Sequence, residues 1–418
     1  MIEVVEFGKS DAQFTMYYER GCQKRIDAGD MTEEDKNLIL AFVASLQATA
    51  DISAIRSYKI CNTLSNVSRF VKTPYAQNTI ADVYTGVNAL KAADRTLIGN
   101  MNKPGKLSAN TIQDYVKQLK RFYLWLIDEG FCTTIQREKI LKIKNPSGNK
   151  LTKTPDMLLS EEEINRILSV CYTKRDKALV SVLYESGCRI HEIGKLMWKD
   201  VTFDKHFAKL STAGKTGVPR LIPLTASRSY LAAWKDSYCK FGNPEGDSPV
   251  FLTGEGKSFT YTYLKKLVCE LCSRAGITKH ITPHIFRHSR ITNLIRAGVP
   301  QTTVSMMMWG TPTSDQLETY LHLVNNDVEK DVAKLAGIKL DEEHEEEQSF
   351  KPRVCPRCLH TNGPDAHFCS VCGAALTKET AIELEEMKEE IHADERYVKM
   401  INELQEKLKM LESMIPSN

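Results

Sequence analysis

Residues 282–289 of the 418-residue chain read TPHIFRHS and contain the pattern H-x-x-R at His284 and Arg287. Residues three apart on a helix share a face, so both side chains would point the same way from a helix here. A histidine exchanges a proton near neutral pH, and an arginine is a permanent planar cation that can grip two oxygens of one phosphate. Either residue alone is more often structural than catalytic, so the meaning of the pair depends on its surroundings.

Three further short segments in this part of the chain each contain a residue type that reactions at phosphate use: Arg189 in YESGCRIHEI, Lys215 in AGKTGVPR and Tyr320 in LETYLHL. A lysine flanked by glycines on a turn is usually solvated, and a lone tyrosine is far more often core than nucleophile. The four segments are therefore informative through their order and spacing, which are much more specific than any one of them.

Taken together, residues 155 to about 338 resemble the catalytic domain of the tyrosine recombinase (phage integrase) family. The pattern of that family is an Arg in a G-x-R-x-x-E context, a Lys on a β-turn, H-x-x-R, and a Tyr some thirty residues later. The corresponding residues here are Arg189 with Glu192, then Lys215, His284, Arg287 and Tyr320. The run YLHLVNNDVEKDVAKLAGIK, followed by a cysteine cluster, is most similar to archaeal members.

The resemblance implies that the chain cuts and rejoins DNA through a 3′-phosphotyrosyl link, with Tyr320 as the covalent nucleophile. Arg189 and Arg287 would hold the non-bridging phosphate oxygens, because fixed cations stabilise the charge that develops in the transition state. His284 would handle a proton and contact the phosphate, and Lys215 would protonate the departing 5′-oxygen. We expect no ATP or catalytic metal, and we expect Glu192 to orient Arg189 or a neighbouring backbone group rather than to react itself.

One position departs from the family's pattern, which usually has a His or Trp about nine residues before the nucleophile. That spacing falls on Thr311, whereas Trp309 lies eleven residues upstream of Tyr320. Either the turn is longer by two residues and Trp309 fills this position, or the position is degenerate. Trp309 is the favoured candidate, because its indole N–H can donate a hydrogen bond and its ring can support the Tyr320 helix. We expect His288 to point elsewhere on its helix, and we assign no catalytic step to His322.

The rest of the chain predicts a mainly α multidomain protein with a small antiparallel β-sheet in the catalytic domain. Helical spacing of apolar residues predicts a small helical domain over 30–145, with helices capped by Thr32 and Ser108. By size and position this resembles the DNA-clamping core-binding domain of integrases. After a linker, Ser160 and Glu163 form a capping-box pattern that opens the catalytic domain over 155–338. Three short strand-like runs near 201–224 predict its sheet.

Residues 355–373 read CPRCLHTNGPDAHFCSVCG, with two C-x-x-C knuckles separated by ten residues. This spacing predicts a four-cysteine zinc ribbon over 351–376, with Cys355, Cys358, Cys369 and Cys372 as ligands. Because no open coordination position is supplied, we expect the zinc to be structural. His360 and His367 are weaker ligand candidates. Residues 380–414 predict an amphipathic helix near heptad spacing, which either self-associates or packs on its own protein.

The net charge is unevenly distributed. Of the total of +3, residues 341–418 contribute −9, which leaves +12 for residues 1–340. A basic body of this size suits double-stranded DNA as the partner, because phosphate neutralisation supplies much of DNA affinity. No stretch approaches the roughly 18 apolar residues of a membrane span, and no secretory leader is visible, so we expect a cytoplasmic protein without a membrane partner.

The leading interpretation is a site-specific recombinase that integrates or excises a mobile element or resolves multimers. It would act as a homotetramer on two DNA duplexes and associate weakly without DNA. A type IB topoisomerase is the alternative enzyme, since it shares the same residue types but relaxes supercoils as a monomer. A non-catalytic DNA-binding regulator that retains the fold is the alternative outside enzymes, and the complete catalytic set argues against it.

Overall fold

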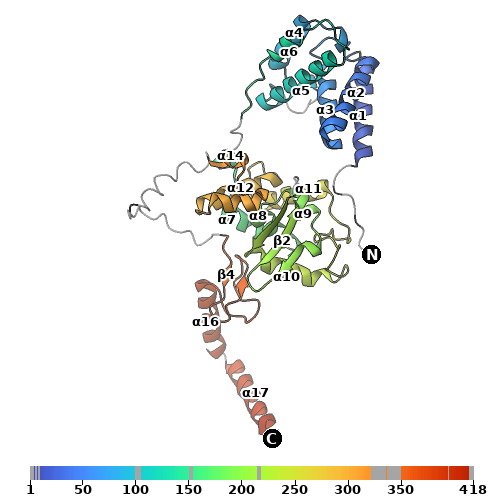
Figure 1. The fold of residues 1–418 in the computed structure, drawn as a ribbon. Coiled ribbons are helices and arrows are strands. Elements are labelled where there is room, and N and C mark those ends of the chain that lie inside the picture. Colours follow the sequence, from blue (N-terminus) through green and yellow to red (C-terminus); the bar gives the residue numbers. More distant parts are fainter. Residues whose placement is uncertain are drawn as a thin grey trace. The chain divides into compact units, whose positions relative to one another are not determined.

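The computed structural model describes residues 4, 7, 10–98, 105–149, 154–213, 218–321, 336, 350–393 and 395–413. The chain forms two compact units, one of residues 8–152 and the other of residues 1–7 and 153–418. Each unit has its own hydrophobic core, so each is described by itself (Figure 1). Among the described helices, none is both long and apolar enough to cross a membrane.

The N-terminal unit is built of helices: α1 (Asp11–Asp27), α2 (Glu33–Ala50), α3 (Ala54–Val67), α4 (Ile80–Ala92), α5 (Ala109–Asp128), α6 (Arg137–Leu141) and the 3-10 turns η1 (Tyr75–Gln77) and η2 (Arg95–Ile98). The predicted caps are confirmed, because Thr32 accepts from the N–H of Asp35 and Ser108 from that of Thr111. Helix α5 buries one apolar stripe against the core, as its periodicity predicts. The unit begins with α1, which precedes residue 30.

Before the cysteine segment, the C-terminal unit contains eight described helices: α7 (Glu161–Ser169), α8 (Lys174–Ser186), α9 (Ile190–Gly194), α10 (Ser227–Tyr238), α11 (Tyr261–Arg274), α12 (Pro283–Arg296), α13 (Gln301–Trp309) and α14 (Glu318–Leu321). The short 3-10 turn η3 (Pro155–Met157) precedes α7, and the turns η4 (Trp198–Asp200) and η5 (Asp315–Leu317) lie between later helices. The capping box at Ser160 and Glu163 is confirmed.

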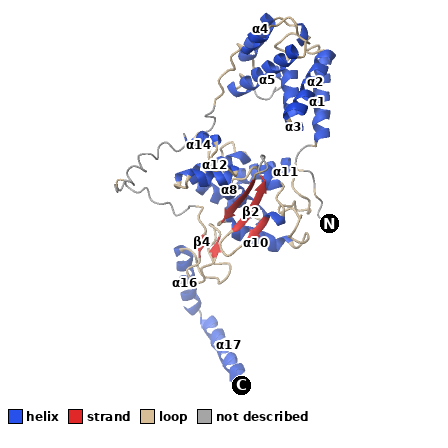
Figure 2. Cartoon of the chain, in the orientation of Figure 1, coloured by secondary structure: helices blue, strands red, loops and turns tan. Residues whose placement is uncertain are grey.

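A three-stranded antiparallel sheet lies among these helices, with strand order β1 (Val201–Phe203), β2 (Ala208–Ala213) and β3 (Pro219–Leu224). Figure 2 shows this sheet beside the helices of the unit. The buried carboxylate of Glu185 at the end of α8 accepts from the backbone N–H groups of Thr225, Ala226 and Ser227. It thereby satisfies the N-terminal donors of α10 and ties α8 to the end of β3. The predicted fold class is confirmed.

The cysteine module, which is the predicted ribbon over 351–376, packs on the same unit. Phe350 is buried against Tyr184 in an edge-to-face contact with ring centroids 4.9 Å apart. The module has a two-stranded ladder, β4 (Arg353–Val354) with β5 (Thr361–Asn362), and Asp365 accepts from Lys177 on α8 and from the hydroxyl of Tyr230 on α10. Two helices follow, α16 (Lys378–Ala393) and α17 (Glu395–Ser413).

Candidate active site

Arg189 is the N-cap residue of α9, just after α8 ends. Gly187 closes α8 with φ of +57°, and a side chain there would meet Met308 within 2.8 Å, so a glycine is needed. Glu192 accepts from the backbone N–H of Arg189 at 2.7 Å through Oε2 and from its guanidinium Nη1 at 3.3 Å through Oε1. The predicted orienting contact of Glu192 on Arg189 is therefore present.

The carboxylate of Glu192 lies in a buried, strongly cationic setting. Its Oε1 is also 2.7 Å from Nη2 of Arg220, a side chain on β3 that is entirely inaccessible to solvent. Burial pushes the pKa of Glu192 upward, but the N–H of Arg189 and the charges of Arg220 and Arg189 outweigh it, so the pKa is lowered. Glu192 therefore stays ionised at neutral pH.

Arg287 lies on α12 and is 5% exposed. Its Nη1 donates to the carbonyl of Gly187 at 2.7 Å, and its Nη2 donates to the carbonyl of Met308 at 2.9 Å. The guanidinium also lies over the ring of Trp309, 5.3 Å from its centroid. Burial and the neighbouring charge of Arg189 lower the pKa of Arg287 to about 10, which leaves it cationic at neutral pH.

Tyr320 lies on α14 and is 5% exposed, packed in a small apolar cluster with residues such as Met308 and Leu317. Its ring centroid is 6.3 Å from that of Trp309 and 5.2 Å from that of His288. Burial raises the pKa of the Tyr320 hydroxyl, while the charges of Arg287 and then Arg189 oppose the rise. The structure thus brings the predicted nucleophile together with both predicted phosphate-binding arginines.

Trp309, rather than Thr311, is the residue in contact with these groups. It is the last residue of α13, which ends at Gly310 with φ of +79°, and its indole Nε1 donates to Oε1 of Gln316 at 2.8 Å. This hydrogen bond ties α13 to the turn that leads into the Tyr320 helix. Thr311 is exposed, and its hydroxyl donates to the carbonyl of Thr313.

The other predicted residues have different outcomes. His284 is exposed one turn before Arg287 on α12. The expectation that His288 points elsewhere was wrong, because its ring packs against Tyr320 at the distance given above. The position of a residue on its own helix does not determine which later segment of the chain packs against it. Lys215 and His322 lie outside the described residues.

Arg220 lies in none of the sequence motifs, although the pattern of β3 indicates that its side chain is buried. Residues of this strand alternate between exposed and buried, and the alternation puts Arg220 on the buried face with Ile222 and Leu224. An arginine in the buried register of a strand needs partners for its charge. Those partners are Glu192, Thr212 and the carbonyls of Met307 and Met308.

The four cysteines of the ribbon also converge. Their sulfur atoms all lie within 4.8 Å of one another, with Cys355 and Cys372 3.5 Å apart and Cys358 and Cys369 3.5 Å apart. The N–H of Arg357 points at the sulfur of Cys355, as in a metal-binding knuckle. The four thiolates fit a tetrahedral zinc site. His367 instead bonds the hydroxyl of Thr380 through Nδ1.

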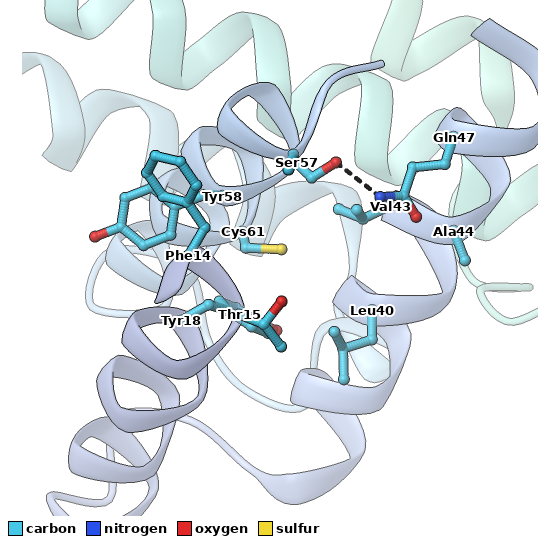
Figure 3. A pocket seen from close by; sticks show the side chains of 11 residues that line it. Phe14, Thr15, Tyr18, Leu40, Val43, Ala44, Gln47, Ser57, Tyr58 and Cys61 are labelled. Atoms are coloured by element: carbon cyan, nitrogen blue, oxygen red, sulfur yellow. Dashed lines mark hydrogen bonds between the residues drawn. The ribbon is translucent and has the colours of Figure 1, made fainter. Parts of the chain in front are cut away.

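A separate pocket of about 450 Å³ lies among α1, α2 and α3 of the N-terminal unit (Figure 3). Its lining is mostly apolar, including Phe14, Leu40 and Val43, and the amide of Gln47 donates to the hydroxyl of Ser57 at its edge. None of the candidate catalytic residues lines it, so it contributes nothing to the site described above.

Comparison with known proteins agrees with this geometry. Residues 158–326 match the phage integrase family, and the matched range contains all six candidate catalytic residues. The tyrosine recombinase XerD of Oceanobacillus iheyensis is 31% identical over 228 residues, which covers 52% of this chain and 73% of that protein. The chain belongs to the phage integrase family.

Other relatives of this integrase-family chain extend the match. The tyrosine recombinase XerD of Listeria monocytogenes serotype 4b is 26% identical over 276 residues, covering 63% of this chain and 88% of that protein. Among solved structures, XerH recombinase bound to its difH substrate matches with a TM-score of 0.52 at 17% identity, over 80% of this chain and all of that chain. Lambda integrase bound to DNA matches with a TM-score of 0.50 at 12% identity, over 68% and 96%. These two structures show a shared fold.

Proposed function

We propose that this integrase-family chain is a site-specific DNA recombinase that cleaves and rejoins strands through Tyr320. The observation that carries the proposal is the cluster of Tyr320 with Arg287 and Arg189, whose charges both act on the tyrosine hydroxyl. A buried tyrosine beside two arginines has the groups that nucleophilic attack on a phosphodiester requires. Integration, excision and multimer resolution are the processes that this chemistry serves.

The two arginines form a phosphate clamp. A phosphodiester is anionic, so a nucleophile approaches it only where fixed cations meet the added charge of the transition state. Arg189 and Arg287 supply these cations, and losing one such group typically costs ~3–4 kcal/mol of barrier. In the state described, Arg287 donates to two carbonyls, and the partly exposed Arg189 retains N–H groups for an incoming phosphate.

The reaction exchanges one phosphate ester bond for another. The oxygen of Tyr320 attacks phosphorus, the bond from phosphorus to the 5′-oxygen breaks, and a 3′-phosphotyrosyl link and a 5′-hydroxyl result. His284 is assigned to proton handling and Lys215 to protonating the 5′-oxygen. Because the phosphotyrosyl link keeps the bond energy, the 5′-hydroxyl of a second strand reverses the step without ATP or a catalytic metal. Trp309 supports the nucleophile's helix.

The remaining assignments follow from this reaction. The partner is double-stranded DNA, which the helical N-terminal unit holds. A homotetramer exchanges strands between two duplexes, and the protein acts in the cytoplasm. The ribbon holds a structural Zn²⁺ through Cys355, Cys358, Cys369 and Cys372, which fit it by number and spacing. We also infer an affinity with archaeal members, supported by the run from Tyr320 to Lys339 followed by the cysteine module.

The test is capture of a covalent adduct. Nicked fragments of the source genome are incubated with the full-length protein, and detergent-stable protein–DNA adducts are recovered and sequenced to obtain the cognate duplex. We expect wild-type protein to form the adduct and Tyr320→Phe to bind the recovered duplex without forming it. An adduct that survives Tyr320→Phe refutes the nucleophile assignment. Relaxation of supercoiled plasmid that lacks the site would instead indicate a type IB topoisomerase.

A further inference from the structure

We infer that Arg220 is a positioning residue for the phosphate clamp, an inference that rests on the proposed function. Arg220 lies on β3, outside the segments that supply the clamp and the nucleophile. Its side chain is entirely buried. It aligns Arg189 and Arg287 because it binds one hydrogen-bond partner of each.

The guanidinium of Arg220 is held by four acceptors. Nη2 contacts Oε1 of Glu192 at 2.7 Å and the hydroxyl of Thr212 at 3.2 Å. Nη1 donates to the carbonyl of Met307 at 3.2 Å and to that of Met308. A buried cation is costly unless such bonds compensate for lost water, so this arrangement is tightly determined.

The first link runs through Glu192. One of its oxygens is shared between Nη2 of Arg220 and Nη1 of Arg189, while the other accepts the backbone N–H of Arg189. With the carboxylate fixed by Arg220, the guanidinium of Arg189 has a defined direction. Without Arg220, Glu192 would be free to form a tighter pair with Arg189 and turn that guanidinium away from the phosphate.

The second link runs through the carbonyl of Met308, which accepts from both Arg220 and Arg287. Met308 precedes Trp309, whose ring contacts both Arg287 and Tyr320. The chain also passes so close to Arg220 that a side chain at Gly310 would meet its Cγ at 3.0 Å. The guanidinium of Arg220 therefore contacts a hydrogen-bond partner of Arg189 and a hydrogen-bond partner of Arg287. It also contacts the segment that leads to Tyr320.

A matched control shows what a merely structural arginine would do. Arg175 on α8 is also mostly buried and ion-paired, with Asp176 at 2.7 Å, and donates to the carbonyl of Leu252. Among the described residues, its contacts are with Asp176, Leu252, Tyr263 and Phe259, and these do not include the clamp or Tyr320. Arg175→Met should thus reproduce the loss of a buried ion pair without altering the clamp.

The experiment measures single-turnover cleavage of the nicked duplex recovered with wild-type protein. We expect Arg220→Met and Arg220→Lys to slow cleavage on the order of 100-fold, the cost of a small misplacement of reacting groups. The affinity of these variants for the duplex should resemble that of Arg175→Met. Their folded fraction, measured by thermal unfolding, should also resemble that of Arg175→Met. Arg175→Met itself should cleave within about twofold of wild type.

A second substrate separates positioning from stability. A methylphosphonate at the cleaved position removes one charged oxygen, so the reaction depends less on the arginine clamp. If Arg220 acts through the clamp, the defect of Arg220→Met shrinks at least about tenfold on this substrate. The proposal is overturned by near wild-type cleavage in the Arg220 variants, by an equal defect on both substrates, or by failure of both variants to fold. Absence of an adduct with wild-type protein would overturn the proposed function instead.

Discussion

At Tyr320, the proposed nucleophile, burial and positive charge shift the pKa of the hydroxyl in opposite directions. Burial raises its pKa above the ordinary value of about 10, and the charges of Arg287 and Arg189 limit the rise. An incoming phosphate would neutralise these charges, so the hydroxyl also needs a proton acceptor at the moment of attack. The site therefore keeps the tyrosine protonated, with or without bound phosphate, until the attack itself.

This balance predicts the pH dependence of cleavage. Because the phenolate is the attacking form and the pKa of Tyr320 is raised, the single-turnover rate should increase from about pH 7 to about pH 9. Replacing Tyr320 with 3-fluorotyrosine, whose hydroxyl is more acidic, should move the rising limb to lower pH. Rates on duplexes of the cognate site measure both profiles. Superimposable profiles for the two proteins would contradict deprotonation of Tyr320 as the limiting event.

Trp309 and Thr311 can be separated by paired substitutions. Trp309→Ala removes the ring that contacts Arg287 and Tyr320 and the hydrogen bond to Gln316, so cleavage should fall on the order of 100-fold. Trp309→Phe retains the ring and should recover part of the rate. Thr311→Ala should stay within about twofold of wild type, since its hydroxyl bonds only its own turn in the described structure. A larger loss in Thr311→Ala than in Trp309→Ala would reverse the assignment.

Among the elements, the ribbon has a direct connection to the catalytic helices. Asp365 lies in the loop between the two cysteine knuckles and accepts from Lys177 of α8 at 2.6 Å and from the hydroxyl of Tyr230 of α10. Burial and then the Asp365 carboxylate raise the pKa of Tyr230, which keeps that hydroxyl a donor. Helix α8 ends at Gly187, whose carbonyl binds Arg287, so the ribbon stabilises a helix of the active site.

We therefore expect loss of this contact to destabilise the catalytic part. Asp365→Ala should lower the free energy of unfolding by about 2 kcal/mol, because it removes a charged hydrogen-bond partner of two donors. Asp247→Ala is the control, since Asp247 pairs with Lys199 in an exposed ion pair. Thermal unfolding of the full-length protein measures both changes.

Removal of the proposed zinc should lower the free energy of unfolding by at least as much as Asp365→Ala, because the metal would fold the loop that presents the carboxylate. A strong chelator added to the purified protein should lower its melting temperature, and added Zn²⁺ should restore it. If chelation left the melting temperature of the wild-type protein unchanged, docking of the ribbon would not depend on metal.

For the whole molecule, α17 is the described element with the most exposed apolar side chains. Met400, Leu404, Leu408 and Met410 are each more than half exposed. Ile401, Leu404, Leu408 and Leu411 follow one another at spacings of three and four, which is the repeat of a coiled-coil seam. Helices α16 and α17 cover most of the predicted helix over 380–414, and the short seam on α17 would support weak association.

Changing Leu404 and Leu408 together to Glu should therefore abolish self-association of the free protein, measured by sedimentation over a range of concentrations. Formation of the covalent adduct by single protomers should be unaffected, whereas exchange of strands between two duplexes should become slower. Unchanged sedimentation would show that α17 packs on its own protein in solution.

The order of the sequence motifs was enough to predict much of the fold and chemistry of this protein. Arg189, His284, Arg287 and Tyr320 could be selected because their order and spacing resemble the pattern of the tyrosine recombinase family. The paired C-x-x-C knuckles and the three strands were recognisable because turn residues and alternation are local properties. These features were sufficient to predict the fold class and the type of chemistry.

Contacts between residues distant in the chain were decided only by the tertiary structure. Arg220 and Met307 are 87 residues apart, and Lys177 and Asp365 are 188 apart, so no spacing rule connects them. The same holds for the packing of His288 and Trp309 on Tyr320, which depends on how α12, α13 and α14 meet. Side-chain type and local periodicity determine what a segment can do, whereas packing in three dimensions determines which groups support the reaction.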